Sequence, residues 1–124
     1  MTYSANRVLV ATAVVVSLAL GVAGCSGKQT HLDQSKLGAI IDVRIEDKYI
    51  YGHLENAIGA DYKMDTFRSR VANLSRTGHY GVYGKNRKEV AEAIRFLILM
   101  GFKHLNNLGT IDDAQQLTKR KVVM

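Results

Sequence analysis

The chain has very few of the residues on which redox and metal chemistry depend. Its 124 residues contain a single cysteine, Cys25, and no proline. A single cysteine cannot form a disulfide within the chain, and once its sulfur is blocked no thiol remains for catalysis. The four histidines and four methionines are dispersed without ligand spacing, so we predict no metal site and no cofactor. The absence of proline by itself excludes no fold.

The chain is basic, with 17 lysines and arginines against 11 aspartates and glutamates. A formal net charge of +6 favours anionic partners such as lipid headgroups or cell-envelope polymers. No basic stripe is interleaved with aromatic residues, so nucleic acid is not an expected partner. With 47% hydrophobic and 23% charged residues, the composition is that of one globular domain.

The first 25 residues have the pattern of an export signal. Arg7 precedes an uninterrupted apolar and small-residue stretch over 8–23, which leads into Val22-Ala23-Gly24-Cys25. This ending resembles the bacterial lipobox, in which the cysteine becomes the lipid-modified first residue of the mature protein, although Leu is commoner than Val at its first position. An ordinary cleaved signal and an uncleaved anchor helix of marginal length are the alternatives.

These features predict three parts of the chain. Residues 1–24 would be a lipoprotein signal peptide, 25–35 a polar tether that begins at a Cys25 carrying lipid such as palmitate, and 36–124 the folded domain. The expected location is the extracytoplasmic side of a bacterial cell membrane, to which the lipid anchors the domain.

Short strands alternate with helices in the remainder of the chain, which favours an α/β fold with a mostly parallel central sheet and helices on both faces. The apolar runs predict strands at 38–44, within 53–61, at 80–83 and at 104–108. Amphipathic spacing and capping residues predict helices at 46–51, 65–74, 87–100 and 110–117. The tail over 118–124 is basic and then apolar.

The helix over 87–100 is the clearest element in the sequence. One face carries an apolar stripe, and further apolar residues widen it until little polar surface remains after Arg95, so we expect a largely buried helix. Asn86 can cap its start, and Glu89 has the spacing of a capping box. The stripe consists of Val90, Ala93, Ile94, Leu97 and Ile98, widened by Phe96, Leu99 and Met100.

The junction between the strand at 80–83 and this helix suits an anion. A strand, a tight loop and a helix start direct backbone N–H groups and the positive end of a helix dipole into one small volume. Arg87 and Lys88 lie in the first turn, where the dipole disfavours cations unless an anion is close. The alternative is that both side chains simply extend into water.

Several spaced motifs resemble those of a rhodanese domain, and the resemblance covers almost all of 36–124. The first motif is Ile41-Asp42-Val43-Arg44. The second is Gly52-His53-Leu54-Glu55-Asn56-Ala57-Ile58, in which Glu55 and Asn56 replace the Pro and Gly of the family. The third runs from Gly101-Phe102 to Gly109, and Thr110 replaces a second Gly. The layout is similar to small single-domain exported rhodaneses, including the phage-shock type. The resemblance implies a rhodanese-like fold.

The resemblance also implies that the nucleophile is missing. In the family, a strand ending in Val-Tyr-Cys supplies a cysteine that accepts sulfur as a persulfide. Aligning Val82-Tyr83 and Gly101-Phe102 without a gap puts Gly84 at that position. An alternative alignment on Asn86-Arg87 puts Val82 there and supplies no thiol either.

The implied ligand loop is Gly84, Lys85, Asn86, Arg87, Lys88 and Glu89, with Asp42 and Arg44 at the base of the pocket. The leading hypothesis is a catalytically inactive binding module whose partners are the membrane, through Cys25, and a small oxyanion or an anionic protein. One alternative is a residual sulfurtransferase-type enzyme that uses another group, with His53 or His79 nearby, although each is more typical of a hydrogen-bonded turn histidine. The other is a structural lipoprotein with a vestigial pocket.

Overall fold

The computed structural model describes residues 36–124. The predicted signal peptide, Cys25 and the tether lie outside the described residues. Within 36–124, none of the helices has the length and apolar character needed to cross a bilayer.

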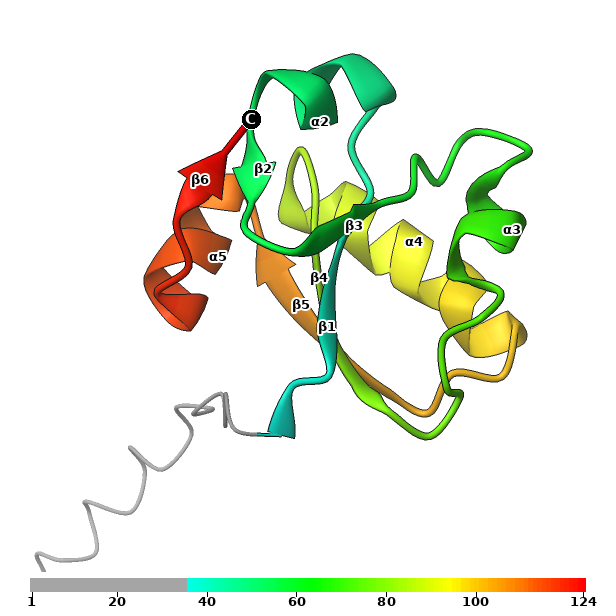
Figure 1. The fold of residues 1–124 in the computed structure, drawn as a ribbon. Helices are drawn as coiled ribbons and strands as arrows, with labels where there is room; N and C mark the ends of the chain where they lie inside the picture. The colour runs from blue at the N-terminus through cyan, green and yellow to red at the C-terminus, as the bar shows by residue number, and fades with distance from the viewer. Residues whose placement is uncertain (1–35) are drawn as a thin grey trace, which may run out of the picture. The chain divides into compact units, whose positions relative to one another are not determined.

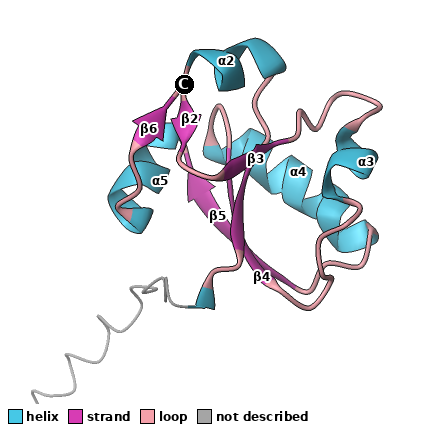
Figure 2. Ribbon diagram, viewed as in Figure 1, coloured by secondary structure: helices cyan, strands magenta, loops and turns pink. Residues whose placement is uncertain are grey.

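Four parallel strands form the central sheet in the order β3-β1-β4-β5 (Figures 1 and 2). Ile41 in the central strand β1 pairs with Ile58 of β3 on one side and with Val82 of β4 on the other. The strands are β1 (Ala39–Asp42), β3 (Ala57–Gly59), β4 (His79–Tyr83) and β5 (His104–Gly109). The predicted α/β fold with a parallel sheet is confirmed.

Helices cover both faces of this sheet, as predicted, and each face has its own core. Successive strand residues point to opposite faces, so Ile41 and Ile40 enter different cores. The core under α3 (Phe67–Val71) and α4 (Arg87–Leu99) contains Ile41, while the core under α5 (Ile111–Thr118) contains Ile40. In Figure 1, α4 and α5 lie on opposite sides of the strands, and α2 (Glu46–Tyr51) lies beyond the arrowheads of the strands.

Helix α4 corrects the expectation of a largely buried helix. Val90, Ala93 and Leu97 are buried against the sheet, but Phe96 and Leu99 are 47% and 83% exposed. The apolar stripe is wider than the face that one sheet can cover, and within the described residues no element packs over the outer side. The helix therefore presents apolar side chains outwards.

The start of α4 also differs from expectation in one detail. Asn86 caps the helix, accepting a hydrogen bond from the backbone N–H of Glu89 at 2.9 Å. The Glu89 carboxylate makes no return bond that would complete a capping box and lies 3.8 Å from the Lys63 ammonium instead. The complete capping box is at α5, where Thr110 and Asp113 bond each other's backbone.

Two further segments depart from the sequence prediction. Helix α3 spans one turn rather than 65–74, because only Phe67 and Val71 are buried and Thr66 makes no side-chain cap. The tail forms β6 (Val122–Val123), which pairs antiparallel with β2 (His53–Leu54) in a separate two-stranded sheet. A strand of two residues has too short a pattern to be predicted.

Candidate functional site

A cavity of about 420 Å³ opens at the carboxyl edge of the central sheet. Strands β1 and β4 are neighbours, and the chain continues from β1 towards β3 but from β4 towards β5, in the opposite direction across the sheet. The cavity therefore lies at the topological switch point, where open α/β sheets bind ligands. Each of the four parallel strands is followed by residues that line it, namely Val43, Arg44, Asp61, Gly84, Lys85 and Thr110.

Gly84 lines this cavity and follows β4 directly. Its backbone N–H donates to the Gly109 carbonyl at 2.9 Å, which ties β4 to β5. A Cβ atom at this position would lie 3.0 Å from a methyl carbon of Val43 and of Val90. The residue therefore lets two core valines close against the backbone. Val82, the position given by the alternative alignment, lies within β4 and is fully buried in the core.

The predicted ligand loop is divided by the structure into two groups. Gly84, Lys85 and Glu89 line the cavity, whereas Asn86, Arg87 and Lys88 do not. The Arg87 guanidinium donates to the Asn107 carbonyl at 3.2 Å, and the Asn107 amide donates back to the Arg87 carbonyl at 3.1 Å. Arg87 is thus held against β5.

The backbone of the loop supplies unpaired donors. Within residues 36–124, the N–H groups of positions 85–88 find no acceptor. Such groups form the positive end of a helix and favour a nearby anion.

Cations outnumber carboxylates around the cavity. Arg44, Lys48, Lys63 and Lys85 line it together with Asp61 and Glu89. The Lys63 ammonium nitrogen lies 3.8 Å from Oε1 of Glu89 and 5.6 Å from the centre of the Tyr62 ring. Sequence reasoning missed Lys48, Asp61, Tyr62 and Lys63. Asp61, two residues beyond β3, carried a usable signal, because polar residues just past parallel strands meet at one edge.

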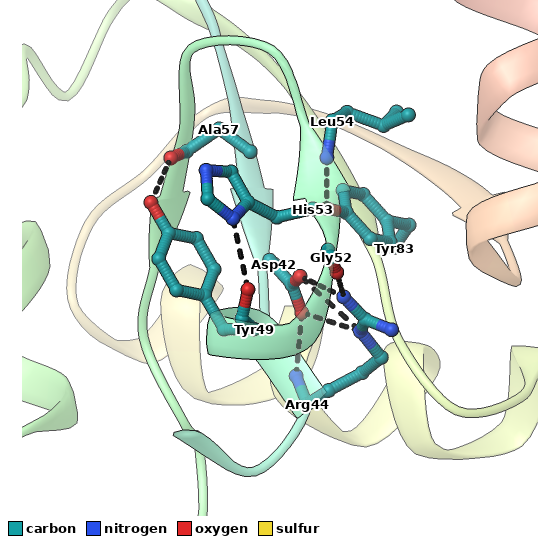
Figure 3. Close-up of polar contacts among 8 residues, drawn as sticks. All are labelled: Asp42, Arg44, Tyr49, Gly52, His53, Leu54, Ala57 and Tyr83. Carbon is teal, nitrogen blue, oxygen red and sulfur yellow. Dashed lines mark hydrogen bonds and ion pairs between the residues drawn. The ribbon is translucent and has the colours of Figure 1, made fainter. Parts of the chain in front are cut away.

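Asp42 and Arg44 form a buried ion pair behind the cavity (Figure 3). The Asp42 carboxylate is fully buried and accepts from the Arg44 side chain, with Nη2 to Oδ2 at 2.7 Å, and from the Arg44 backbone N–H at 3.0 Å. Arg44 Nη2 also donates to the Gly52 carbonyl at 2.6 Å. Burial lowers the pKa of Arg44, but the hydrogen bonds and charge of Asp42 outweigh it, so the net shift of this pKa is upwards. Arg44 remains a fixed positive charge in the cavity wall.

Tyr83 links this pair to β2. Its ring is fully buried, and its hydroxyl accepts a hydrogen bond from the Leu54 backbone N–H at 2.9 Å. Burial raises the pKa of Tyr83, and the nearby charge of Asp42 raises it further. The hydroxyl therefore stays protonated and acts as part of the scaffold. Sequence reasoning missed this role, since nothing in the pattern places Tyr83 beside Leu54.

The two candidate histidines lie away from the cavity lining. His53 donates through Nδ1 to the Tyr49 carbonyl at 2.8 Å and stacks on the Tyr49 ring, which confirms a hydrogen-bonded structural histidine (Figure 3). His79 begins β4, at the opposite edge of the sheet, and stacks on His104 with ring centres 4.2 Å apart. Among residues 36–124, no three histidine, cysteine or acidic side chains converge as metal ligands would.

Searches against protein-family models and against curated proteins find no match, whereas solved structures match in fold. The rhodanese-like domain of the Alr3790 protein from Anabaena sp. superposes with a TM-score of 0.61 at 23% identity, covering 69% of this chain and 98% of that domain. A rhodanese from E. coli, described as containing anions, has a TM-score of 0.53 at 28% identity over 60% of this chain and 88% of its own. SSP1007 from Staphylococcus saprophyticus has a TM-score of 0.52 at 19% identity, covering 60% and 73%. The described domain thus has a rhodanese-like fold, as the motifs predicted.

Proposed function

We propose that the chain is a catalytically inactive, rhodanese-like lipoprotein that binds a small oxyanion in the cavity beside Gly84. The observation that carries this proposal is the cationic lining of the cavity, where four basic side chains face two carboxylates. Of the free N–H groups of the loop, that of Lys85 belongs to a residue of the cavity wall, and it is a donor of the kind that holds anions. The anions described for the E. coli rhodanese support the same class of ligand.

The lack of a nucleophile supports inactivity in sulfur transfer. That chemistry needs a thiolate at the ligand, and Gly84 has no side chain to supply one. The only cysteine, Cys25, is the residue that we propose carries the lipid. With its sulfur in a thioether, the mature protein would hold no thiol.

The membrane anchor is a separate part of the proposal. The support is the apolar stretch over 8–23 and the lipobox-like Val22-Ala23-Gly24-Cys25. Mass spectrometry of the mature N-terminal peptide should find a diacylglyceryl group and an amide-linked fatty acid such as palmitate on Cys25. A Cys25→Ser variant should lack both and retain the signal peptide.

Anion binding is tested by titrating the full chain, in neutral detergent, with thiosulfate, sulfate and phosphate while chloride is held constant. Thermal-shift and calorimetric titrations should show saturable stabilisation by at least one oxyanion. Lys85→Ala should weaken binding by roughly tenfold, because it removes a charged donor from the cavity. Lys103→Ala is the matched control, since this exposed lysine lies just before β5 at the other edge of the sheet and should leave the titration unchanged. The absence of any saturable response would refute the anion site.

The missing nucleophile is tested with Gly84→Cys. The wild-type chain should form no thiocyanate from thiosulfate and cyanide, whereas the variant should gain measurable turnover. The new Cβ must displace Val43 and Val90, which we expect to cost about 1–3 kcal/mol of unfolding free energy. Gly84→Ala should show the same loss of stability without turnover. Sulfur transfer by the wild-type chain would favour the residual enzyme instead.

A further inference from the structure

The outer side of α4 carries a patch of exposed apolar side chains near its C-terminal end. Phe96, Ile98 and Leu99 are 47%, 56% and 83% exposed, and Met64, before α3, is 56% exposed. Phe96, Leu99 and Met64 line one hollow, and contiguous apolar surface of this kind marks a binding face more often than isolated exposed residues such as Ile98 do. None of these side chains contributes to the cavity beside Gly84.

The patch surrounds a hollow of about 220 Å³ between α3 and α4, which lie next to each other in Figure 1. Apolar side chains from α3, from the segment before it and from the end of α4 form most of its wall, namely Tyr62, Met64, Phe67, Phe96, Leu99 and Met100. Two charged residues, Arg68 and Asp65, complete the lining. We call this hollow the α3–α4 surface.

The surroundings of the α3–α4 surface are basic. Helix α4 starts beside the cavity and ends near the start of β5, so its exposed C-terminal turn lies towards the amino edge of the sheet. The chain segments 36–38, 72–79 and 100–104 form this edge, and they contain Lys36, Arg76 and Lys103 but no aspartate or glutamate. Arg95 lies on α4 directly before Phe96. Two carboxylates also lie here, Asp65 in the lining and Glu92 on α4, which accepts a hydrogen bond from the Tyr62 hydroxyl at 2.9 Å. Basic residues still outnumber acidic ones, and an apolar centre with a net basic border is the pattern of a surface that rests on anionic lipid.

The length of chain before the described domain keeps this surface close to a membrane. In the proposed function the lipid is on Cys25, and the described domain begins at Lys36. The segment 26–35 between them would span at most about 35 Å when fully extended, and roughly 17 Å as a flexible coil. The segment joins the domain at the amino edge, where β1 begins. A domain held so close meets the bilayer at a high effective concentration.

We propose that the α3–α4 surface docks on an anionic membrane, with Phe96 and Leu99 at the level of the lipid headgroups and Arg68 and Arg95 against lipid phosphates. The inference rests on the membrane attachment in the proposed function and adds the face through which the domain meets the bilayer. The cavity beside Gly84 opens at the carboxyl edge of the sheet and shares one wall residue, Tyr62, with this surface. A second copy of the chain is a poorer occupant, because basic residues outnumber Asp65 and Glu92 around this surface, and pairing it with itself would bring an excess of like charge together.

The test uses the full chain, which has no tryptophan, so that one introduced tryptophan reports a single position. Phe96→Trp places the probe in the α3–α4 surface, and Gln116→Trp places it on an exposed position of α5, across the sheet. Both proteins are reconstituted into vesicles of phosphatidylcholine and phosphatidylglycerol with brominated acyl chains. We expect the emission of the Phe96→Trp protein to shift to the blue and to fall roughly twofold, with little change for Gln116→Trp.

A second variant tests the charged border. Adding Arg68→Ser and Arg95→Ser to Phe96→Trp should reduce the quenching, as should replacing phosphatidylglycerol by phosphatidylcholine.

Flotation of the vesicles on a density gradient separates the two proposals. Protein that floats with lipid but shows equal quenching at both positions, or none at position 96, overturns the docking surface and leaves the attachment standing. Protein that does not float contradicts the attachment as well. A lipid-free dimer in sedimentation that protects position 96 would make a second copy the occupant and overturn membrane docking.

Discussion

At the scale of single residues, Asp42 and Arg44 have unequal roles although they form one ion pair. Arg44 is stabilised by Asp42 and by the Gly52 carbonyl, and it reaches the cavity wall. Asp42 is fully enclosed and serves to hold Arg44 in place. Asp42 therefore fixes the position of Arg44, and of the two residues only Arg44 can contact a ligand in the cavity.

The first prediction concerns the loss of this buried carboxylate. Asp42→Asn should lower the unfolding free energy by about 3 kcal/mol, because it leaves a largely buried guanidinium without a counter-charge. Adding Arg44→Met should recover part of this loss, since the uncompensated charge is then removed. Urea denaturation of the three proteins measures both values. A double variant less stable than Asp42→Asn would contradict the interpretation.

The second prediction concerns Tyr83 at high pH. Its pKa is raised in the folded protein, while a tyrosine in the unfolded chain ionises near the ordinary value of 10.0. As pH rises above 10, the unfolded state loses this proton first, so stability falls with pH by up to about 1.4 kcal/mol per unit from this residue. Well below pH 10 Tyr83 is protonated in both the folded and the unfolded state, so it does not make the unfolding free energy depend on pH.

Tyr83→Phe separates the two contributions of this side chain. At neutral pH the variant should lose about 1–3 kcal/mol, because the buried Leu54 N–H loses its acceptor. Between pH 10 and 11 its stability should decline less steeply than that of the wild type. Urea midpoints at several pH values test this, and parallel declines in both proteins would show that Tyr83 is not responsible for the alkaline loss.

At the scale of elements, α4 contains neighbouring leucines in opposite environments. Leu97 is fully buried, and Leu99 is 83% exposed. Leu97→Ala should cost about 2–5 kcal/mol, since it leaves a cavity in the core. Leu99→Ala should change stability by no more than about 0.5 kcal/mol. Thermal and urea unfolding of the matched pair give the comparison, and similar losses for both would mean that the outer face is covered.

The elements that the sequence predicted well are those with a long pattern. The run of strand-favouring residues Tyr80, Val82 and Tyr83 in β4 and the helical spacing of Val90, Ala93 and Leu97 in α4 identify a strand and a helix without tertiary information. What the pattern of α4 cannot tell is how much of an apolar stripe the sheet covers, and so the exposure of Phe96 was missed. Two-residue strands such as β6 exist only through their partner and carry no periodicity of their own.

The candidate site was predictable in the same unequal way. Asp42 ends β1 and Gly84 follows β4, and these two strands are neighbours in the sheet. The sequence motifs at both positions therefore located the site at the carboxyl edge of the sheet. Lys48 and Lys63 come from a helix and a loop whose approach to that edge depends on how the chain packs. Arg87 is a residue that the sequence placed in the site and the structure does not. Its position at the start of α4 suggested a contact with the ligand, but its hydrogen bond to the Asn107 carbonyl holds it against β5.

At the scale of the whole molecule, the two edges of the parallel sheet have different surroundings. The carboxyl edge holds the cavity with its mixed but mainly cationic lining, and the amino edge holds basic segments and the end of the α3–α4 surface. A parallel sheet makes this separation possible, because all strand ends of one kind lie together. Ligand binding and membrane docking can therefore use different ends of the domain.

This separation predicts that the two binding events are independent. Phe96→Ser should abolish lipid docking, as measured by protection of the α3–α4 surface from proteolysis on vesicles, while leaving the oxyanion titration within about twofold of the wild type. Lys85→Ala should have the opposite pattern, with anion binding weakened by roughly tenfold and protection on vesicles unchanged. Phe96 and Lys85 line different hollows that share a single residue, Tyr62, so the two substitutions should act nearly additively. Should either variant alter both measurements, Tyr62, whose ring centre lies 6.2 Å from that of Phe96, is the first candidate for the coupling, and the binding of lipid and anion would have to be treated as coupled.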